Sequence, residues 1–147
     1  MLISMFISYY KTYTGNTYIP LTNNQNFTAI IGANGIGKSS VLEGLDCLFN
    51  QAEWNINNTG KKSGTSAFVV STFLVNKSRL TSKNRDTKVL VSLYEYMDSY
   101  LRNVGADNFN SSQKSIVSEF VKHRDTILLA DNNSDKYLCI AGRQSEN

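Results

Sequence analysis

Apolar residues recur with the period of a β-strand in some segments and with the period of an α-helix in others. The sequence therefore predicts an α/β domain. Strands are predicted for the first seven residues and for Thr17 to Leu21, with a polar turn from Lys11 to Asn16 between them. The apolar and β-branched run Phe27 to Ile31 predicts a buried strand of a parallel sheet. Phe68 to Val75 predicts a further strand, because β-branched and aromatic residues fill it.

Helical spacing of apolar residues appears in three places. A helix is predicted from about Lys38 to Asn50, followed by an Asn-, Gly- and Ser-rich loop over 51–66. A second helix is predicted from Thr87 to Gly105, whose apolar stripe is expected to pack on the core. A third helix is predicted from Ser112 to Arg124.

The last part of the chain predicts two strands, Thr126 to Ala130 and Tyr137 to Ala141, joined by a turn. Asp131 ends the first of them, which is where many nucleotide-binding proteins present a carboxylate near magnesium. Asn132 follows where a water-activating glutamate is common, and a hairpin turn between two strands is the simpler interpretation. The sequence leaves both interpretations open.

Composition favours one globular domain with a core of its own. The 147 residues are 41% hydrophobic and 18% charged, and no apolar stretch is long enough to span a bilayer. The start of the chain has neither a basic lead nor a cleavage site, so a cytoplasmic location is expected. Cys47 and Cys139 form no metal-binding pattern with the one histidine, His123, which is expected to be an exposed helix residue.

Positive charge is concentrated in residues 61–88. Seven basic residues stand there against a single acid, Asp86: Lys61, Lys62, Lys77, Arg79, Lys83, Arg85 and Lys88. A polar, basic stretch of this kind is able to contact a nucleic-acid backbone, although solvated loops often have the same composition. Contact between residues 61–88 and DNA is therefore a hypothesis.

The strongest motif lies between the strand predicted at 27–31 and the helix that follows. Gly32, Gly37, Lys38 and Ser39 match the phosphate-loop pattern G-x-x-x-x-G-K-[ST]. Backbone N–H groups from Gly35 to Ser40 are expected to surround a phosphate, aided by the partial positive charge of the helix N-terminus. The segment 32–40 therefore predicts a nucleotide site.

Three side chains have separate roles in this prediction. Lys38 supplies a cation for the β- and γ-phosphates, and the Ser39 hydroxyl is the expected Mg²⁺ ligand. Ser40 is placed to reach the α-phosphate. Trp54, in the following loop, is expected either to anchor the loop by packing or to act as a stacking platform.

Residues 32–45 resemble the motif G-x-N-G-x-G-K-S-[SN]-[LV]-L-E-A-[LI] of SMC, RecF and OLD-type ATPase heads, which are AAA family ATP-binding proteins. The opening of the chain is similar to that group's L-x-I-x-x-F-[KR]-S-F start, with Leu2, Ile7, Tyr10, Lys11, Thr12 and Tyr13 in comparable order. The resemblance covers residues 2–49 and implies ATP with Mg²⁺ as ligands. The residues expected at the nucleotide are Gly32, Asn34, Gly35, Ile36, Gly37, Lys38, Ser39, Ser40 and Lys11.

The same resemblance implies a P-loop NTPase fold with an antiparallel N-terminal flank and a parallel core sheet. In that group two heads enclose two ATP molecules, so a second head, or a C-terminal lobe of the same protein, is the expected partner. The chain lacks the group's Ser-Gly-Gly signature and a strand ending in Asp-Glu, and Asn76 and Lys77 stand where a glutamine is expected. Residues 1–147 are therefore expected to form one partial domain, the N-terminal lobe of a head, with little hydrolysis of its own.

Three hypotheses for function follow. The first is an ABC-type ATPase that acts in DNA repair or phage defence. The second is a compact small-molecule kinase or GTPase, which requires Asp131 at the metal and a lid arginine such as Arg79 or Arg85. The third is a non-catalytic remnant that binds a nucleotide or a partner.

Overall fold

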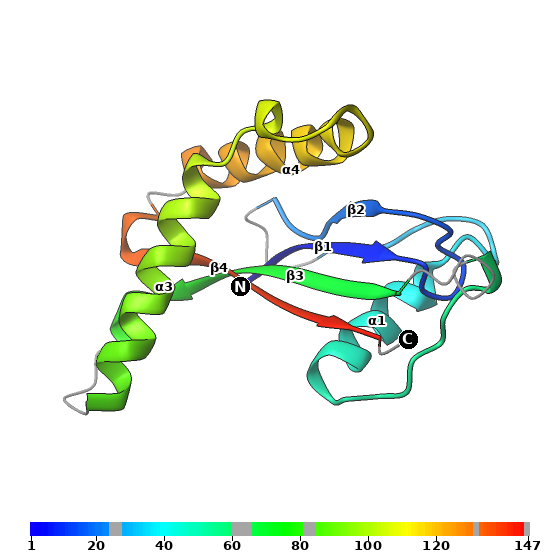
Figure 1. Ribbon diagram of the computed structural model, residues 1–147, viewed down its shortest axis with the longest axis horizontal. Helices are drawn as coiled ribbons and strands as arrows, with labels where there is room; N and C mark the ends of the chain where they lie inside the picture. Colours follow the sequence, from blue (N-terminus) through cyan, green and yellow to red (C-terminus); the bar gives the residue numbers. More distant parts are fainter. Residues whose placement is uncertain (24–27, 60–65, 81–84, 131–132, 146–147) are drawn as a thin grey trace.

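The computed structural model describes residues 1–23, 28–59, 66–80, 85–130 and 133–145, in the arrangement of Figure 1. Within these residues, the named elements are four strands, three α-helices and three short 3₁₀ helices. In chain order they are β1 (Leu2–Ser8), β2 (Thr17–Pro20), α1 (Lys38–Phe49), β3 (Phe68–Asn76), η1 (Lys77–Arg79), α3 (Arg85–Asn103), η2 (Ala106–Asn108), α4 (Ser111–Ala130), η3 (Asn133–Asp135) and β4 (Lys136–Gln144).

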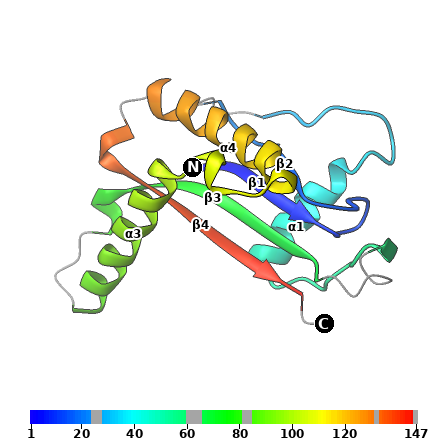
Figure 2. The same cartoon turned by 45° about the horizontal axis from the view of Figure 1, so that its top comes forward.

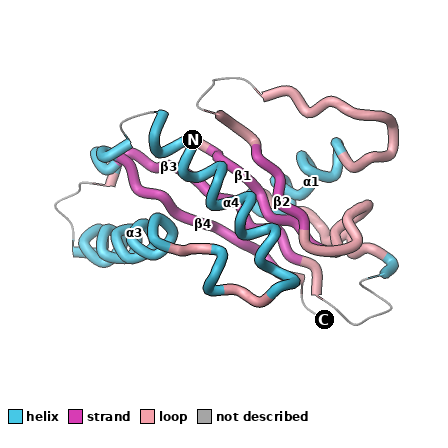
Figure 3. Tube along the Cα trace, turned by 90° about the horizontal axis from the view of Figure 1, so that it is seen from above, coloured by secondary structure: helices cyan, strands magenta, loops and turns pink. Residues whose placement is uncertain are grey.

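The four strands form one sheet in the order β2-β1-β3-β4, and every neighbouring pair is antiparallel. Figure 3 shows the strands lying side by side beneath α4. Met5, in the central strand β1, is paired with Ile19 of β2 and with Ser71 of β3. No parallel pair occurs among the described strands, so the antiparallel flank is present in them and the parallel core sheet is not.

A β-bulge near the start of β1 decides which side chains enter which layer. Leu2 pairs with Phe73 and Ser4 with Thr72, so the intervening Ile3 is the extra residue. Ile3 therefore joins the cluster under α4, whereas Met5 and Ile7 join the cluster under α1. Without the bulge, strict alternation would place all three on one face.

Helices cover both faces of the sheet, as Figures 1 and 2 show. Helix α1 packs on one face over a cluster of Met5, Ile7, Tyr10, Leu21, Val41, Cys47 and Val69. Helix α4 and the end of α3 pack on the other face over Ile3, Tyr18, Leu74, Leu101, Val104, Phe120, Ile127 and Leu138. The molecule is thus a three-layer α/β/α sandwich, which agrees with the predicted α/β class.

A buried arginine joins the two helices of the second layer. The guanidinium of Arg124 on α4 donates to the carbonyl oxygens of Leu101, at 2.8 Å, and Val104, at 2.7 Å, at the C-terminal end of α3. Its Nε also donates to Asp125 at 2.8 Å. These bonds satisfy carbonyls that the end of a helix leaves without an intrahelical partner.

The predicted strand at 27–31 is wrong over its described part. Residues 28–33 have no regular secondary structure, Ile31 is 90% exposed, and no described strand lies beside the segment to pair with it. Instead of lying in a sheet, the segment forms part of the wall of an open groove, described below. A strand needs a hydrogen-bonded neighbour, and hydrophobicity alone does not provide one.

The predicted strand Thr126 to Ala130 is also wrong, because these residues form the last turns of α4. Phe120, Arg124 and Ile127 recur at helical spacing and are all buried, so they keep the segment helical. The Thr126 hydroxyl donates to the carbonyl of Lys122 at 2.9 Å, one turn earlier. The strand predicted at Tyr137 to Ala141 is confirmed within β4.

The remaining predicted elements are confirmed, with small differences at their ends. The two N-terminal strands, the helix after the phosphate loop and the strand at 68–75 correspond to β1, β2, α1 and β3. The helix predicted from Thr87 is α3, and the helix predicted from Ser112 is α4. The expectation that the apolar stripe of the first helix packs on the core is wrong in part, because Val89, Leu93 and Tyr100 are more than half exposed. The strand residue Phe27 and the carboxylate candidate Asp131 lie outside the described residues.

Candidate phosphate-binding site

Helix α1 begins at Lys38, and two glycines in the three residues before it have left-handed backbone. Gly35 has a φ of 82° and Gly37, the N-cap residue, has a φ of 103°. No side chain caps this helix end, so its first N–H groups have no side-chain acceptor. Uncapped amides at the end of a helix dipole attract an anion, which is the arrangement that the motif predicts.

Gly37 is also in close contact with the turn after β1. A Cβ atom at this position would lie 2.7 Å from the Thr12 hydroxyl oxygen and 3.2 Å from the Tyr13 ring. The Tyr13 hydroxyl donates to the Gly37 carbonyl at 3.4 Å, and burial raises the pKa of Tyr13, which keeps the phenol a neutral donor. The Thr12 and Ser40 hydroxyls lie 3.4 Å apart. The N-terminal turn therefore forms one wall of the phosphate loop.

The Lys38 ammonium lies inside the loop from which it comes. It donates to the carbonyl oxygens of Gly32 at 2.5 Å and Ala33 at 2.6 Å. These contacts hold the positive charge on the concave side of the loop, beside the first turn of α1. A phosphate oxygen that replaced these carbonyls would gain a charge-assisted hydrogen bond.

Lys11 lies at the same cavity, where its ammonium forms an ion pair with Glu43 on α1. Its backbone has a φ of 50°, which is uncommon for a residue other than glycine. The backbone is held on both sides, because the Lys11 N–H donates to the Asn55 carbonyl at 2.8 Å and the Asn57 amide donates to the Lys11 carbonyl. The loop at 55–57 thus fixes the turn that carries Lys11.

Trp54 and Arg143 hold the loop at 55–57 in place. The Trp54 ring lies edge-on to Tyr10, with centroids 5.9 Å apart, and the Arg143 guanidinium lies 5.3 Å from the Trp54 ring. Arg143 donates to the Cys47 carbonyl at 2.8 Å and to the Ala52 carbonyl at 2.9 Å. Trp54 is therefore a packing anchor. Burial raises the pKa of the Cys47 thiol, which stays neutral, as expected for a structural cysteine.

The walls enclose a cavity of about 290 Å³ at the start of α1. Its lining residues are Lys11, Thr12, Asn34, Gly35, Gly37, Lys38, Ser39, Ser40 and Glu43. Seven of the nine predicted site residues are among them; Gly32 and Ile36 are not, although Gly32 reaches the site through its carbonyl. Thr12 and Glu43 were not predicted as site residues, yet both belong to the motifs that carry the resemblance.

The comparison with protein families agrees with this geometry, since the AAA ATPase domain matches residues 1–146. The chain belongs to the AAA ATPase domain family. Domains of this family in general bind ATP together with Mg²⁺, and they have a P-loop NTPase α/β fold. Neither a curated protein nor a solved structure matches the chain.

Other candidate residues of this AAA ATPase domain have structural roles or lie elsewhere. His123 is only partly exposed, because its ring bonds to the Tyr18 hydroxyl at 2.5 Å and to the Thr22 carbonyl at 2.6 Å. Lys77 donates to the Ser134 carbonyl at 2.6 Å and lies over the Tyr137 ring. Within the described residues, no cluster of acidic, histidine or cysteine side chains suits a metal ion, and no helix is long and apolar enough to cross a membrane.

Proposed function

We propose that this AAA ATPase domain supplies the phosphate-loop half-site of an ABC-type ATPase of the SMC, RecF and OLD-like group, acting in DNA repair or phage defence. The observation that carries the proposal is the uncapped start of α1, with Lys38 inside the loop and Lys11 on the opposite wall. Family membership supports ATP binding in general. The resemblance of residues 2–49 to that group supports the narrower assignment.

In the proposed complex, backbone N–H groups of Gly35 to Ser40 hold the β-phosphate at the helix end. Lys38 exchanges its two carbonyl acceptors for phosphate oxygens, and the Ser39 hydroxyl ligates Mg²⁺. Lys11, held by Glu43, adds a second positive charge near the nucleotide. These groups bind and orient the phosphates, and the sequence has neither an apolar strand ending in Asp-Glu nor a Ser-Gly-Gly signature, so little hydrolysis is expected from this chain.

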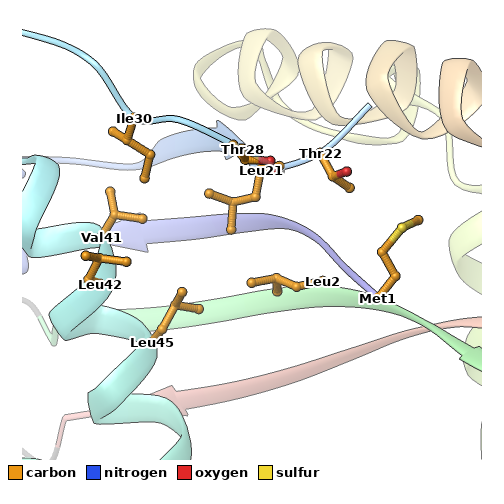
Figure 4. Close-up of a pocket in the computed structure, with 9 residues that line it drawn as sticks. All are labelled: Met1, Leu2, Leu21, Thr22, Thr28, Ile30, Val41, Leu42 and Leu45. Carbon is orange, nitrogen blue, oxygen red and sulfur yellow. Dashed lines mark hydrogen bonds between the residues drawn. The ribbon is translucent and has the colours of Figure 1, made fainter. Parts of the chain in front are cut away.

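An apolar groove beside the phosphate loop supports the proposal that a further lobe packs against this domain. The groove has a volume of about 460 Å³, and Figure 4 shows side chains from β1, α1 and residues 28–30 around it. Its lining residues are Met1, Leu2, Leu21, Thr22, Thr28, Ile30, Val41, Leu42 and Leu45. A strand laid parallel to residues 28–31 would cover this surface and begin the parallel core sheet. We propose that a C-terminal lobe or a second ATPase head supplies it.

DNA contact through residues 61–88 remains part of this proposal. Arg79 and Lys88 are exposed in the described part of that stretch, whereas Lys77 is already bound to Ser134 and Tyr137. Arg79 and Lys88 are therefore the described side chains proposed to reach a phosphate backbone.

Calorimetric titration with ATP and Mg²⁺ tests the site. Lys38→Ala is expected to weaken ATP binding at least about tenfold, because a charge-assisted bond to phosphate is lost. The matched control is Lys114→Ala, which removes an exposed lysine that pairs with Asp107 and is expected to leave binding unchanged. Equal ATP affinity in the wild type and in Lys38→Ala would contradict the proposal.

A further inference from the structure

Helix α3 has an apolar stripe that no described residue covers. Four residues, Val89, Leu93, Tyr96 and Tyr100, are between 51% and 73% exposed. They recur at intervals of four, three and four, which is the spacing that places residues along one seam of a packed helix pair. We call these four residues the outer stripe.

The outer stripe is separate from the face with which α3 contacts the rest of the molecule. Tyr94 stacks on Tyr137 of β4 with centroids 6.1 Å apart, and Met97 and Leu101 pack on the core under α4. These inward residues occupy a different side of the helix. Figures 1 and 2 show α3 crossing the end of the sheet, with its N-terminal turns extending beyond the strands.

The sizes of the four side chains vary in a regular way along the helix. The smaller aliphatic residues, Val89 and Leu93, lie in the N-terminal half, and the two tyrosines lie in the C-terminal half. Beside the tyrosines the surface is hollowed by about 380 Å³, between α3 and η2. A second copy of α3 in antiparallel orientation would place Val89 against Tyr100 and Leu93 against Tyr96, each pair occurring twice. A parallel copy would oppose tyrosine to tyrosine and valine to valine.

The area of this surface suits a dimer. Because aromatic side chains each carry roughly 150–250 Å² of surface and aliphatic ones somewhat less, the four residues of the outer stripe, at 51% to 73% exposure, present about 500 Å². Two copies would bury about 1,000 Å² from these side chains alone, which reaches the lower limit for a specific interface. A patch of this size lies in the upper part of the range that monomers expose, and patches of this kind often mark interaction sites. The tyrosine hydroxyls stay at the rim, where water satisfies them.

We propose that two copies of this chain associate through the outer stripe of α3, antiparallel and about a two-fold axis near residues 94 and 95. A two-fold axis makes the interface self-complementary, and the aliphatic half of each helix then meets the aromatic half of its partner. The interface is remote from the phosphate loop, so the dimer forms without nucleotide. It is distinct from any ATP-dependent contact between two heads.

Light scattering on the nucleotide-free 147-residue chain at micromolar concentration tests the dimer. The wild type and Lys38→Ala are expected to have the mass of a dimer. Leu93→Glu is expected to weaken association about a hundredfold, because it places an unpaired charge against an aromatic ring at the interface. The control Leu129→Glu makes the same kind of change at a residue of α4 that is 85% exposed and should leave the dimer intact.

Oxidative crosslinking tests the orientation. Val89 and Tyr100 are about 16 Å apart along the helix, so Val89→Cys alone and Tyr100→Cys alone should not form disulfide dimers, whereas a mixture of the two proteins should. The native Cys47 and Cys139 are buried and do not interfere. Each single variant crosslinking to itself would overturn the antiparallel arrangement. A wild-type monomer, a dimer unaffected by Leu93→Glu, or a dimer that requires ATP would overturn the proposal as a whole.

Discussion

At the scale of single residues, Gly37 has the strictest requirement in the phosphate loop. Its φ is 103°, and the Thr12 hydroxyl oxygen lies 2.7 Å from the position that a Cβ would take, so no side chain fits without a shift. Gly37→Ala is therefore expected to lower the free energy of unfolding by about 1–3 kcal/mol. Urea denaturation measures this change.

Gly105 provides the matched control for that substitution. Its φ is −115°, and nothing lies within 4 Å of a Cβ built on it. Gly105→Ala is expected to change the free energy of unfolding by less than about 0.5 kcal/mol. A loss at Gly105 as large as that at Gly37 would show that the contact with Thr12 does not limit the loop.

The helix start after the phosphate-loop motif could be predicted because it depends on local chemistry. The spacing of Gly32, Gly37 and Lys38 specifies a turn and a helix start without help from distant residues. The ion pair between Lys11 and Glu43 is different. It joins residues 32 positions apart and depends on a backbone reversal at Tyr9 and Lys11, both at φ 50°, which nothing in their identities indicates.

At the scale of elements, Arg124 fixes the junction between α3 and α4. Its guanidinium is buried and satisfies two carbonyls at the end of α3. Arg124→Met keeps most of the apolar stem and leaves these carbonyls unsatisfied, so a loss of about 2–3 kcal/mol is expected. Thermal unfolding followed by circular dichroism measures it. Lys122→Met, at an exposed position on the same helix, should have little effect, and equal losses in both variants would contradict this role.

Strong periodic elements could be predicted from the sequence, but short apolar runs could not be assigned from their composition. Residues 126–130 and 28–31 have similar β-branched and apolar content. The first run extends a helix because Ile127 continues the buried spacing of Phe120 and Arg124. The second forms no strand because no described strand pairs with it. The burial of Ile127 and the pairing of residues 28–31 both depend on elements that are distant in sequence.

At the scale of the whole molecule, burial of two titratable groups makes the free energy of unfolding fall as the pH becomes alkaline. Burial raises the pKa of Cys139 from 9.0 to about 11 and that of Tyr18 from 10.0 to about 12. The folded protein therefore keeps these protons at a pH where the unfolded chain loses them. Their stabilising contribution is complete below pH 9, and it falls as the pH rises from 9 towards 12.

Urea unfolding in reducing buffer at successive pH values from 8 to 11 measures this decline. Cys139→Ala is expected to make the decline between pH 9 and pH 11 smaller by about 1 kcal/mol or more. Cys139 is 4% exposed, so its own replacement also costs some stability at pH 8. An unchanged slope in the variant would mean that the thiol ionises as easily in the folded protein as in the unfolded chain.

The α/β class of the molecule could be predicted from the sequence, whereas the division of its core into two layers could not. The bulge at Ile3 sends neighbouring apolar residues of β1 to opposite helices. Apolar residues at nearly every position of a strand show only that both faces are buried. The position of β3 between β1 and β4 depends in the same way on pairings across sixty residues or more.

The contacts of Arg143 imply an order in which the parts of the nucleotide site form during folding. Arg143, on the last strand, joins the end of α1 to the loop that holds Lys11, and β4 pairs with β3, which pairs with β1. During synthesis the phosphate loop emerges long before these supports exist. We expect the nucleotide site to become rigid only after β4 has docked, so that ATP is captured late in folding and not by the nascent chain.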